Sequence, residues 1–436
     1  MNQISKFQIG LIGAFVLFLV GGLIAFATYK GSSSSTALPP ITIWGTIPSS
    51  TFGSFFQVYN ATLPQQLPIT YVQKSEATIS SEYTEALALD TGPDILLLPS
   101  DLVFQNEQKI LPIPAQSLTL RTLRDVFIPL AEQYARPSGI LAVPFAVDPM
   151  VMYWNRDTFT NAGLATYPRT WGEIQTLAPR FLVTDANRNL RKSLVSLGEY
   201  RNVTHSRELL GLLFMQAGNP VYSLRSGEVV SFLGFTQELK DIAEDVISYF
   251  VQFANPVSST YSWNRTAPQS KSAFIAGNLG LYFGYSSEVS DIRTKNFNLN
   301  FDVAPMPQIA GSGLRMTYGQ IYGLSIARSS RNPMAAFTVM MQLADYAAQK
   351  EWSAQTKLPP VRRDLIAEGT IDPYLTIFYD GALISRGWIE PSSQGTDRAF
   401  QGLVESVISG RETKTNAITR AHDEMLVLSQ RINVNQ

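Results

Sequence analysis

The hydrophobic pattern that begins at residue 41 alternates between short apolar runs and stretches with helical periodicity. The apolar runs, which have the length of buried strands, span residues 41–44, 68–73 and 94–98. The stretches between them place apolar side chains three or four residues apart, over residues 49–60 and 80–89. Strands that alternate with helices predict a mainly parallel sheet covered on both faces, which is an α/β fold.

The rest of the chain is richer in helical periodicity. Helices are predicted at 170–181, 207–217 and 236–253 and over most of the chain after residue 332. Further short strands are predicted at 193–198, 279–283, 301–304 and 321–326. Hydroxyl side chains that could cap the predicted helices are those of Ser49, Ser50, Ser80, Ser81 and Thr170.

The N-terminal segment differs from everything that follows. Residues 7–29 contain no charged side chain and are long enough to cross a bilayer as one helix. Lys6 and the amino terminus precede this run, which predicts a cytoplasmic N-terminus. Residues 1–30 are therefore a transmembrane anchor or a signal segment cleaved after Ala27. The apolar run is longer than a usual signal core, which favours the anchor, and residues 31–40 (GSSSSTALPP) form a flexible linker.

Composition narrows the function. A chain of 436 residues is long enough for two domains. The net charge of −1 leaves no basic excess for binding nucleic acid. The chain has no cysteine, and its two histidines, His205 and His422, are far apart, so neither a thiolate nor a multi-histidine metal site is expected. We find no nucleophile elbow, phosphate loop, zinc motif or suitable carboxylate pair, so we expect neither an enzyme nor a cofactor.

Seven motifs follow one another in a fixed order from residue 91 to residue 365. They are TGPDILLL (91–98), GILAVPFAVDPMVMYWNRDTFTNAGL (139–164), YPRTWGEI (167–174), SAFIAGNLGLYFGY (272–285), FDVAPMP (301–307), SIARSSRNPMAAF (325–337) and TKLPPVRRDL (356–365). No single motif is specific. Together they resemble the bacterial extracellular solute-binding proteins of the maltose-binding type, which are family 1 solute-binding proteins of ABC importers.

The resemblance implies a two-lobed periplasmic-binding-protein fold, with a hinge and an interlobe cleft, after the N-terminal transmembrane helix. Lobe 1 is expected at 41–147 and 305–362, and lobe 2 at 148–304, with the C-terminal helices of 363–436 mostly in lobe 2. The implied function is to bind a small polar solute, with a sugar favoured, and to deliver it to ABC permease subunits. We expect a monomer whose folded domain is extracytoplasmic and tethered to the cell membrane.

Candidate binding residues lie where predicted strands end, because open α/β sheets bind ligands at the carboxyl ends of their strands. Carboxylates accept hydrogen bonds from sugar hydroxyls, and aromatic rings stack on the apolar faces of sugars. Relatives use a carboxylate near the positions of Asp101 and Asp148 and an aromatic ring at that of Tyr285. The predicted ligand-binding residues are Trp44, Ser49, Ser50, Asp101, Asp148, Tyr200, Tyr285, Tyr318 and Trp388.

Six of the candidates also have a purely structural interpretation. Ser49, Ser50 and Asp101 could cap helices, and Asp148 could make a structural hydrogen bond. Tyr200 could be a surface aromatic, and Trp388 could pack against a helix. Leu98 stands where some sugar binders carry a stacking tryptophan, which argues against a maltodextrin.

Two other functions remain open. The solute could be a phosphate ester, a polyamine, a peptide or a ferric ion. A phosphate ester would require a cleft cation, for which Arg201 is the only obvious candidate, and a polyamine would require more carboxylates than Asp101 and Asp148. The chain could also be a surface protein that transports nothing.

Overall fold

The computed structural model describes residues 38–187, 189–225 and 228–433. The predicted anchor or signal segment, and the linker up to residue 37, lie outside the described residues. None of the helices in the described part of the chain combines the length and apolar composition needed to cross a membrane.

The first strands and helices form where the hydrophobic pattern predicts them. The parallel strands are β1 (Ile41–Gly45), β2 (Ile69–Gln73) and β3 (Ile95–Pro99). The helices that follow β1 and β2 are α2 (Ser49–Thr62) and α3 (Ile79–Ala88). Every residue of β3 is buried, as expected of a strand inside a covered sheet.

The remaining elements keep the α/β alternation. The strands are β4 (Ile110–Leu111), β5 (Ala135–Arg136), β6 (Gly139–Ile140), β7 (Val143–Asn155), β8 (Val183–Thr184), β9 (Leu190–Val195), β10 (Tyr222–Arg225), β11 (Glu228–Ser231), β12 (Leu279–Tyr285), β13 (Phe301–Ala304), β14 (Thr317–Ala327) and β15 (Ser385–Arg386). The α-helices are α4 (Ser100–Gln105), α5 (Leu120–Val126), α6 (Arg156–Asn161), α7 (Trp171–Leu177), α8 (Ser206–Gln216), α9 (Gln237–Val251), α10 (Ser270–Ile275), α11 (Glu288–Lys295), α12 (Pro333–Leu343), α13 (Tyr346–Thr356), α14 (Arg363–Glu368), α15 (Pro373–Ile384), α16 (Ser393–Ile408) and α17 (Lys414–Asn433). Short 3₁₀ helices are η1 (Glu107–Lys109), η2 (Pro129–Tyr134), η3 (Ala178–Arg180) and η4 (Gln252–Ala254).

One mixed sheet connects most of the strands, in the order β2-β1-β3-β14-β7-β12-β9-β8. β13 also pairs with β7, and β4 and β15 also pair with β14. The α/β class is confirmed, but the sheet is less parallel than predicted. β14 is antiparallel to β3 and β7, and β12 and β13 are antiparallel to β7. The two strands in the middle of the sheet, β7 and β14, therefore run in opposite directions.

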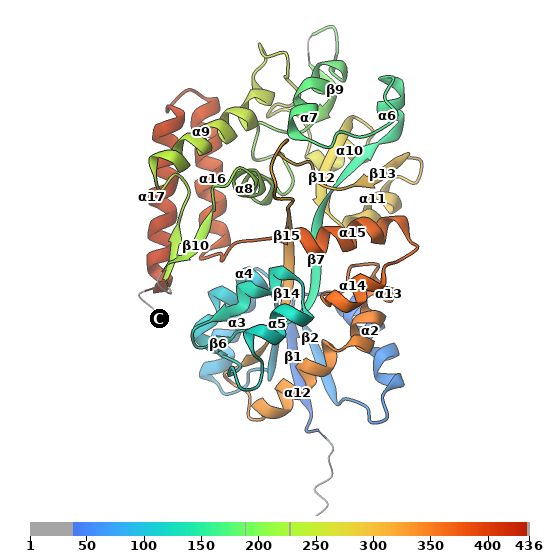
Figure 1. Cartoon of the computed structure of the whole chain (residues 1–436), viewed down its shortest axis with the longest axis vertical. Coiled ribbons are helices and arrows are strands. Elements are labelled where there is room, and N and C mark those ends of the chain that lie inside the picture. Colours follow the sequence, from blue (N-terminus) through green and yellow to red (C-terminus); the bar gives the residue numbers. More distant parts are fainter. Residues whose placement is uncertain (1–37, 188, 226–227, 434–436) are drawn as a thin grey trace, which may run out of the picture. The chain divides into compact units, whose positions relative to one another are not determined.

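The 13-residue strand β7 is buried along its whole length and belongs to two groups of elements. Its first half, up to Pro149, pairs with β14, and its second half, from Met150, pairs with β12 and β13. Figure 1 shows β7 and β14 passing between a lower group, which contains α2, α5 and α12, and an upper group, which contains α7, α8 and α10. In the C-terminal region, α13 packs on α2 and α14 on α5, whereas α16 and α17 pack on α9.

Aromatic side chains build the core of the lower group of elements. The Phe145 ring, on β7, lies 4.8 Å from Trp352 and 5.8 Å from Phe55 between ring centroids. Tyr59 stacks on Phe55 at 5.8 Å, and Trp352 is 1% exposed. This core attaches α13 to α2 and to the first half of β7, so a segment near residue 350 completes a unit that begins near residue 41.

Two of the three helix caps predicted from the sequence are wrong. Pro48, not Ser49 or Ser50, occupies the cap position of α2, and Thr78, not Ser80 or Ser81, that of α3. Thr170 does cap α7, since its side chain accepts a hydrogen bond from the Glu173 amide.

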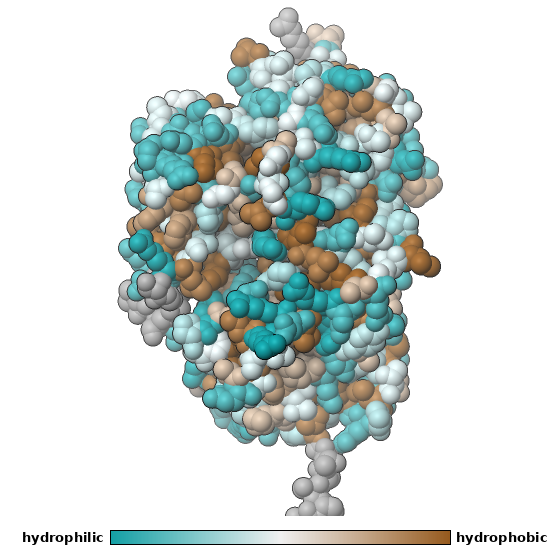
Figure 2. Space-filling model, in the orientation of Figure 1, coloured by the Kyte–Doolittle hydropathy of each residue, from teal (hydrophilic) through white to brown (hydrophobic). Residues whose placement is uncertain are grey.

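Figure 2 shows hydrophobic residues scattered among hydrophilic ones on the visible face of the molecule.

Candidate functional site

Three predicted aromatic residues converge where β12, β14 and β15 meet. Tyr285 ends β12, and its ring centroid lies 6.4 Å from that of Tyr318 on β14. The Tyr318 ring lies 5.0 Å from Trp388, which follows β15. A Cβ atom at Gly319 would come within 2.5 Å of Ser385 Oγ, so a glycine is needed for β15 to pair with β14. This pairing brings Trp388 next to Tyr318.

Arg207 and Glu208 lie beside these rings, at the start of α8. Arg207 Nη2 is 2.6 Å from Glu208 Oε1, and Arg207 Nη1 is 3.8 Å from Glu390 Oε2. Glu390 is 3% exposed, and it also accepts hydrogen bonds from Trp388 Nε1 at 2.8 Å and Thr396 Oγ1 at 2.7 Å. We call these six residues the aromatic–carboxylate cluster: Arg207, Glu208, Tyr285, Tyr318, Trp388 and Glu390.

The charges of the cluster depend on Arg207. Burial alone would raise the pKa of Glu208, but the positive charges of Arg207 and His205 outweigh it and hold the pKa below its usual range. Burial raises the pKa of Glu390, which Arg207 opposes only in part. Sequence analysis missed all three charged members. Arg207 and Glu208 were assigned only to a helix, although two opposite charges in the first turn of a helix that follows a loop could have indicated a binding site.

Asp101 connects the lower group of elements to the C-terminal helices. It lies in the first turn of α4, and its Oδ2 accepts a 2.6 Å hydrogen bond from Ser393 Oγ at the start of α16. Gln105 Nε2 donates to the same Ser393 hydroxyl at 3.1 Å. The cap position of α4 is Pro99, so the predicted capping alternative for Asp101 is wrong.

Asp148 lies inside the protein, on β7 beside Tyr285. It is 9% exposed, and its Oδ1 accepts hydrogen bonds from Ser286 Oγ at 2.6 Å and from the Ser287 amide at 3.1 Å. Burial raises the pKa of Asp148, and these hydrogen bonds oppose the change. The structural hydrogen bond predicted as one alternative is therefore present, and direct contact of Asp148 with a solute stays a prediction.

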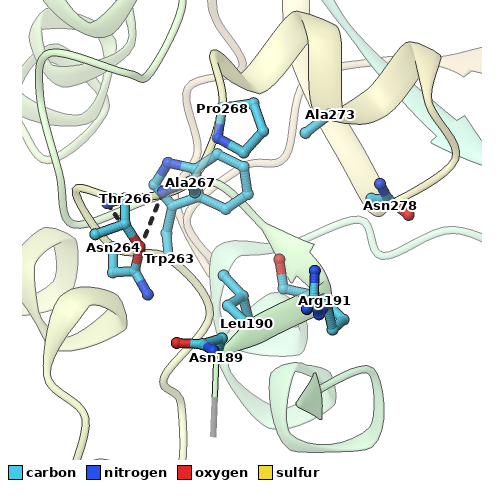
Figure 3. Close-up of a pocket in the computed structure, with 11 residues that line it drawn as sticks. Asn189, Leu190, Arg191, Trp263, Asn264, Thr266, Ala267, Pro268, Ala273 and Asn278 are labelled. Atoms are coloured by element: carbon cyan, nitrogen blue, oxygen red, sulfur yellow. Dashed lines mark hydrogen bonds between the residues drawn. The ribbon is translucent and has the colours of Figure 1, made fainter. Parts of the chain in front are cut away.

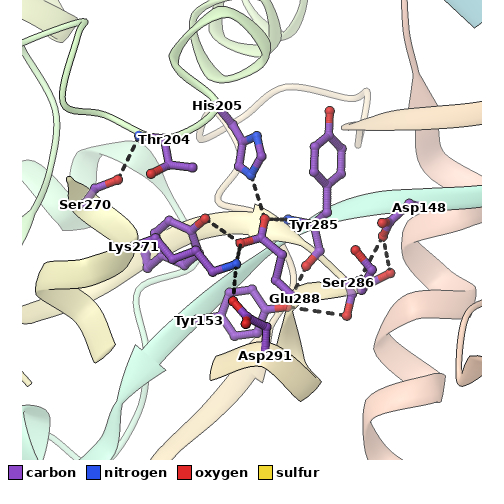
Figure 4. Close-up of polar contacts among 12 residues, drawn as sticks. Asp148, Tyr153, Thr204, His205, Ser270, Lys271, Tyr285, Ser286, Glu288 and Asp291 are labelled. Carbon is purple, nitrogen blue, oxygen red and sulfur yellow. Dashed lines mark hydrogen bonds and ion pairs between the residues drawn. The ribbon is translucent and has the colours of Figure 1, made fainter. Parts of the chain in front are cut away.

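Glu288 holds the residues around Tyr285 in place (Figure 4). Its Oε1 is 2.6 Å from His205 Nε2 and accepts a 3.0 Å hydrogen bond from the Tyr285 amide. Its Oε2 accepts from Tyr282 OH at 2.7 Å and pairs with Lys271 Nζ at 2.8 Å. The His205 ring in turn stands edge-on to Tyr285, at 4.6 Å between centroids.

The ionisation of this network follows from its contacts. Burial alone would raise the pKa of Glu288, but hydrogen bonds and positive charge from His205 and Lys271 lower it to about 2. Burial alone would lower the pKa of His205, but Glu288 more than compensates, so the pKa of His205 is raised. His205 has a left-handed backbone conformation, with φ of 60°. The network therefore fixes an unfavourable backbone geometry directly before α8.

The other predicted residues lie outside the cluster. Tyr200 is 3% exposed, and its hydroxyl donates to Asp397 Oδ1 at 2.8 Å, so it is not the surface aromatic considered above. Trp44, on β1, lies under Lys74, whose Nζ is 4.1 Å from the ring centroid. Ser49 and Ser50 are exposed, and the Ser49 amide donates to Gln73 Oε1 at 2.8 Å.

Two pockets lie in the upper group of elements. The first, of about 340 Å³, adjoins the cluster and is lined by His205, Ser206, Arg207, Glu208, Ser393, Gln394 and Asp397. The second, of about 380 Å³, lies between β9 and α10 and contains none of the predicted residues (Figure 3). Within the described ranges, no group of three or more histidine or acidic side chains could hold a metal ion.

Comparison with known proteins identifies the family. Residues 59–374 match the family model of the bacterial extracellular solute-binding proteins. The chain belongs to this family. The prediction made from the seven motifs is thereby confirmed, and members of this family are binding proteins. No curated protein sequence matches the chain.

Solved structures of solute-binding proteins share the fold. A cyclo/maltodextrin-binding protein complexed with maltotetraose aligns with a TM-score of 0.71 and 16% identity, over 91% of this chain and 99% of its own. A cyclic α-maltosyl-1,6-maltose-binding protein from Arthrobacter globiformis aligns with a TM-score of 0.72 and 17% identity, over 90% and 100%. CpMnBP1 with mannobiose bound aligns with a TM-score of 0.65 and 19% identity, over 88% and 98%. At these identities the alignments show the fold.

Proposed function

We propose that the chain is the extracytoplasmic solute-binding component of an ABC importer and that it binds a sugar or oligosaccharide between two lobes. The observation that carries the proposal is the convergence of Tyr285, Tyr318 and Trp388 with the Arg207–Glu208 pair. Aromatic rings suit the apolar faces of a pyranose, and a paired guanidinium and carboxylate suit its hydroxyl groups. Two of the solved structures described above hold a bound sugar, maltotetraose in one and mannobiose in the other, which supports the choice of solute class.

The two lobes in this proposal correspond to the lower and upper groups of elements, which β7 and β14 connect. Lobe 1 comprises 41–147 and 305–362, and lobe 2 comprises 148–304 with most of 363–436. A solute that contacts both lobes favours the closed arrangement in proportion to its differential affinity for it. Delivery to permease subunits and a monomeric state belong to the same proposal. The alternatives are that the chain binds a non-sugar solute or that it is a surface protein that transports nothing.

A thermal-shift screen tests the proposal. Sugars and oligosaccharides that bind the folded state should raise the unfolding midpoint in a concentration-dependent way. Phosphate esters, spermidine and short peptides in the same plate test the alternative solutes. If none of the sugars shifts the midpoint and another class does, the sugar assignment is wrong.

Truncation of Tyr285 should weaken sugar binding without unfolding the protein. We expect Tyr285→Ala to reduce the affinity for the best sugar by roughly 5–30-fold, equivalent to about 1–2 kcal/mol, because a stacking ring is lost. Isothermal titration calorimetry measures the affinity, and the unfolding midpoint of the unliganded variant reports on stability. Tyr346→Ala makes the same change at an exposed position on α13 and should leave the affinity unchanged. Parental affinity in Tyr285→Ala would place the site elsewhere.

We also propose that residues 7–29 anchor the domain in the cell membrane, on the basis of the uncharged sequence alone. The full chain should then fractionate with membranes and resist extraction by salt, and deletion of residues 1–35 should release a folded, soluble domain. Recovery of a mature chain that begins at Thr28 would instead show a cleaved signal segment.

A further inference from the structure

The pocket of about 380 Å³ between β9 and α10 lies apart from the aromatic–carboxylate cluster. Its volume is within the range of about 300–1,000 Å³ that is usual for small-molecule sites. The first residues of β9, the loop of residues 263–268 and Ala273 on α10 form its walls (Figure 3). Asn278, directly before β12, also lines it, whereas Tyr285 of the cluster is the last residue of β12. The pocket and the cluster are therefore at opposite ends of β12.

Two buried polar side chains on the walls of this pocket lack a partner within the described part of the chain. Ser193 is 1% exposed, and its Oγ makes no hydrogen bond to any described residue. Trp263 is 2% exposed, and its indole N–H likewise has no acceptor among the described residues. Buried hydroxyl and indole groups usually have a partner, because an unmade hydrogen bond costs free energy. Hydroxyl groups of a ligand could supply both partners.

The strand geometry places the Ser193 side chain on the pocket side of β9. Successive side chains of a strand point to opposite faces, so Arg191 and Ser193 point to the same face. Both residues line the pocket. The Ser193 amide donates a 3.2 Å hydrogen bond to the Asn278 carbonyl, which attaches β9 to the residue before β12. The backbone that carries the hydroxyl is therefore fixed in place.

Hydrogen bonds also fix the loop on the opposite wall. Asn264 Oδ1 accepts hydrogen bonds from the Thr266 amide at 3.0 Å and the Ala267 amide at 3.1 Å (Figure 3). The carbonyl oxygens of Asn264 and Ala267 accept hydrogen bonds from Nδ2 of the buried Asn202, at 2.9 Å and 3.0 Å. A pocket whose walls are already ordered loses less conformational entropy when a ligand binds.

The lining of the pocket favours a neutral ligand. Arg191 is the only charged side chain among the described residues that line it, and its mostly exposed guanidinium already pairs with Asp185 at 2.8 Å. In the view of Figure 3, the indole of Trp263 lies between Pro268 and Leu190, and these three side chains give the pocket apolar surface. Apolar surface next to hydroxyl, indole and amide groups suits the apolar faces and hydroxyl groups of a pyranose.

We propose that this pocket is a second binding site, which takes a neutral pyranose sugar and is separate from the site at the aromatic–carboxylate cluster. Ser193 and Trp263 form hydrogen bonds to the hydroxyl groups of the sugar, and Leu190 and Pro268 contact its apolar face. All walls of the pocket belong to the upper group of elements, so a sugar binds here without movement of one group relative to the other. The inference does not depend on the proposed function.

Tryptophan resonances report on the two sites separately. The chain has six tryptophans, and incorporation of 5-fluorotryptophan into the full chain gives each a fluorine resonance. Trp263→Phe and Trp388→Phe assign the signals of the pocket and of the cluster. The protein is held in a detergent without a sugar headgroup and titrated with methyl β-D-glucopyranoside. The Trp263 resonance should shift saturably, with a midpoint below about 10 mM. Absence of a saturable shift would overturn the inference.

A variant of the cluster shows where the signal originates. Tyr285→Ala removes a ring of the cluster and should leave the midpoint of the Trp263 titration unchanged. Loss of the Trp263 response in Tyr285→Ala would mean that the sugar binds only at the cluster, and the second site would be refuted.

Removal of the unpartnered hydroxyl tests its role. Ser193→Ala should weaken binding by roughly 2–10-fold, the effect of losing one hydrogen bond. The unfolding midpoint of the unliganded variant should be unchanged or raised, because no described residue bonds to this hydroxyl. Ser272→Ala, at an exposed position on α10, is the matched control and should leave the affinity unchanged. Parental affinity in Ser193→Ala, or a lowered unfolding midpoint, would overturn the assignment of this hydroxyl to the sugar.

A charged analogue and the Trp388 resonance complete the test. Methyl β-D-glucopyranosiduronate has the same ring with a carboxylate, and it should bind to the pocket more weakly than the neutral sugar. Tighter binding would overturn the assignment to a neutral ligand. If sugars shift the Trp388 resonance and not that of Trp263, the second site fails and the proposed function stands. If sugars shift only the Trp263 resonance, the second site stands and the proposed site at the cluster fails.

Discussion

Replacing Arg207 by methionine should lower the free energy of unfolding by about 3–5 kcal/mol at neutral pH, as is typical when one partner of a buried ion pair is removed. The guanidinium is the only cation within ion-pair distance of Glu208 and Glu390 in the described part of the chain. The side chains of these carboxylates are only 10% and 4% exposed. Without Arg207, Glu390 has no cation within ion-pair distance and Glu208 keeps only the more distant charge of His205. Urea unfolding followed by circular dichroism measures the loss.

Two companion variants test the cause of this loss. Arg207→Met combined with Glu208→Gln should recover part of the stability, because only Glu390 is then left buried without its counter-charge. Arg201→Met removes a guanidinium that is 61% exposed and pairs with Glu405 at 2.6 Å, and it should cost at most about 1 kcal/mol. If Arg207→Met costs no more than Arg201→Met, the Arg207–Glu208 pair does not stabilise the fold.

Replacing Glu288 by glutamine should remove about 3 kcal/mol of stability near pH 5–6. The estimate follows from a pKa lowered from 4.5 to about 2, at roughly 1.4 kcal/mol per pKa unit. Because the folded pKa lies below the unfolded one, this stabilisation is present above about pH 4.5 and is lost as the pH falls toward 2. The difference between parent and variant should therefore shrink between pH 5 and pH 2.

His205 should make the stability difference between the parent and Glu288→Gln shrink at alkaline pH as well. Its folded pKa is raised above 6.5, so its contribution is complete below that pH and is lost as the pH rises through the folded pKa. Unfolding by urea at intervals from pH 2.5 to pH 9 measures both limits. Glu82→Gln, which removes a carboxylate from a partly exposed pair with Lys74, is the control and should show no comparable loss. A difference between parent and Glu288→Gln that does not vary with pH would contradict this account.

Local features of the fold were predictable because local sequence determines them. The apolar runs at 41–44 and 94–98 form strands, and residues 49–60 form a helix, because the spacing of the buried side chains along the chain differs between strands and helices. The caps of α2 and α3 were mispredicted because the chain already enters the helix through Pro48 and Thr78, which leaves the serines beyond the cap position. Hydroxyl residues near a helix start predict the cap only to within one or two positions.

The candidate site was predictable only in part, because its contacts join distant residues. Tyr285 and Tyr318 were chosen next to predicted strands, and Trp388 from the last loops that reach the cleft in relatives. The three rings do come together. The bond between Asp101 and Ser393 spans 292 residues, and nothing in either local sequence indicates it. The pairing of Arg207 with Glu390 likewise depends on how the segment after β15 returns to α8. The family resemblance supplied the fold, but the charges around the rings could be found only in three dimensions.

The continuous burial of β7 determines how this protein could be divided. A single cut between Val147 and Met150 would leave each fragment with part of a strand whose partners lie partly in the other fragment. The chain also returns through β14, and again before α16, so no one cut separates two complete folding units. A circular permutation would not change this, because the segments of the two groups would still alternate along the permuted chain. The two groups of elements should accordingly be exchangeable only together, and not as independent modules.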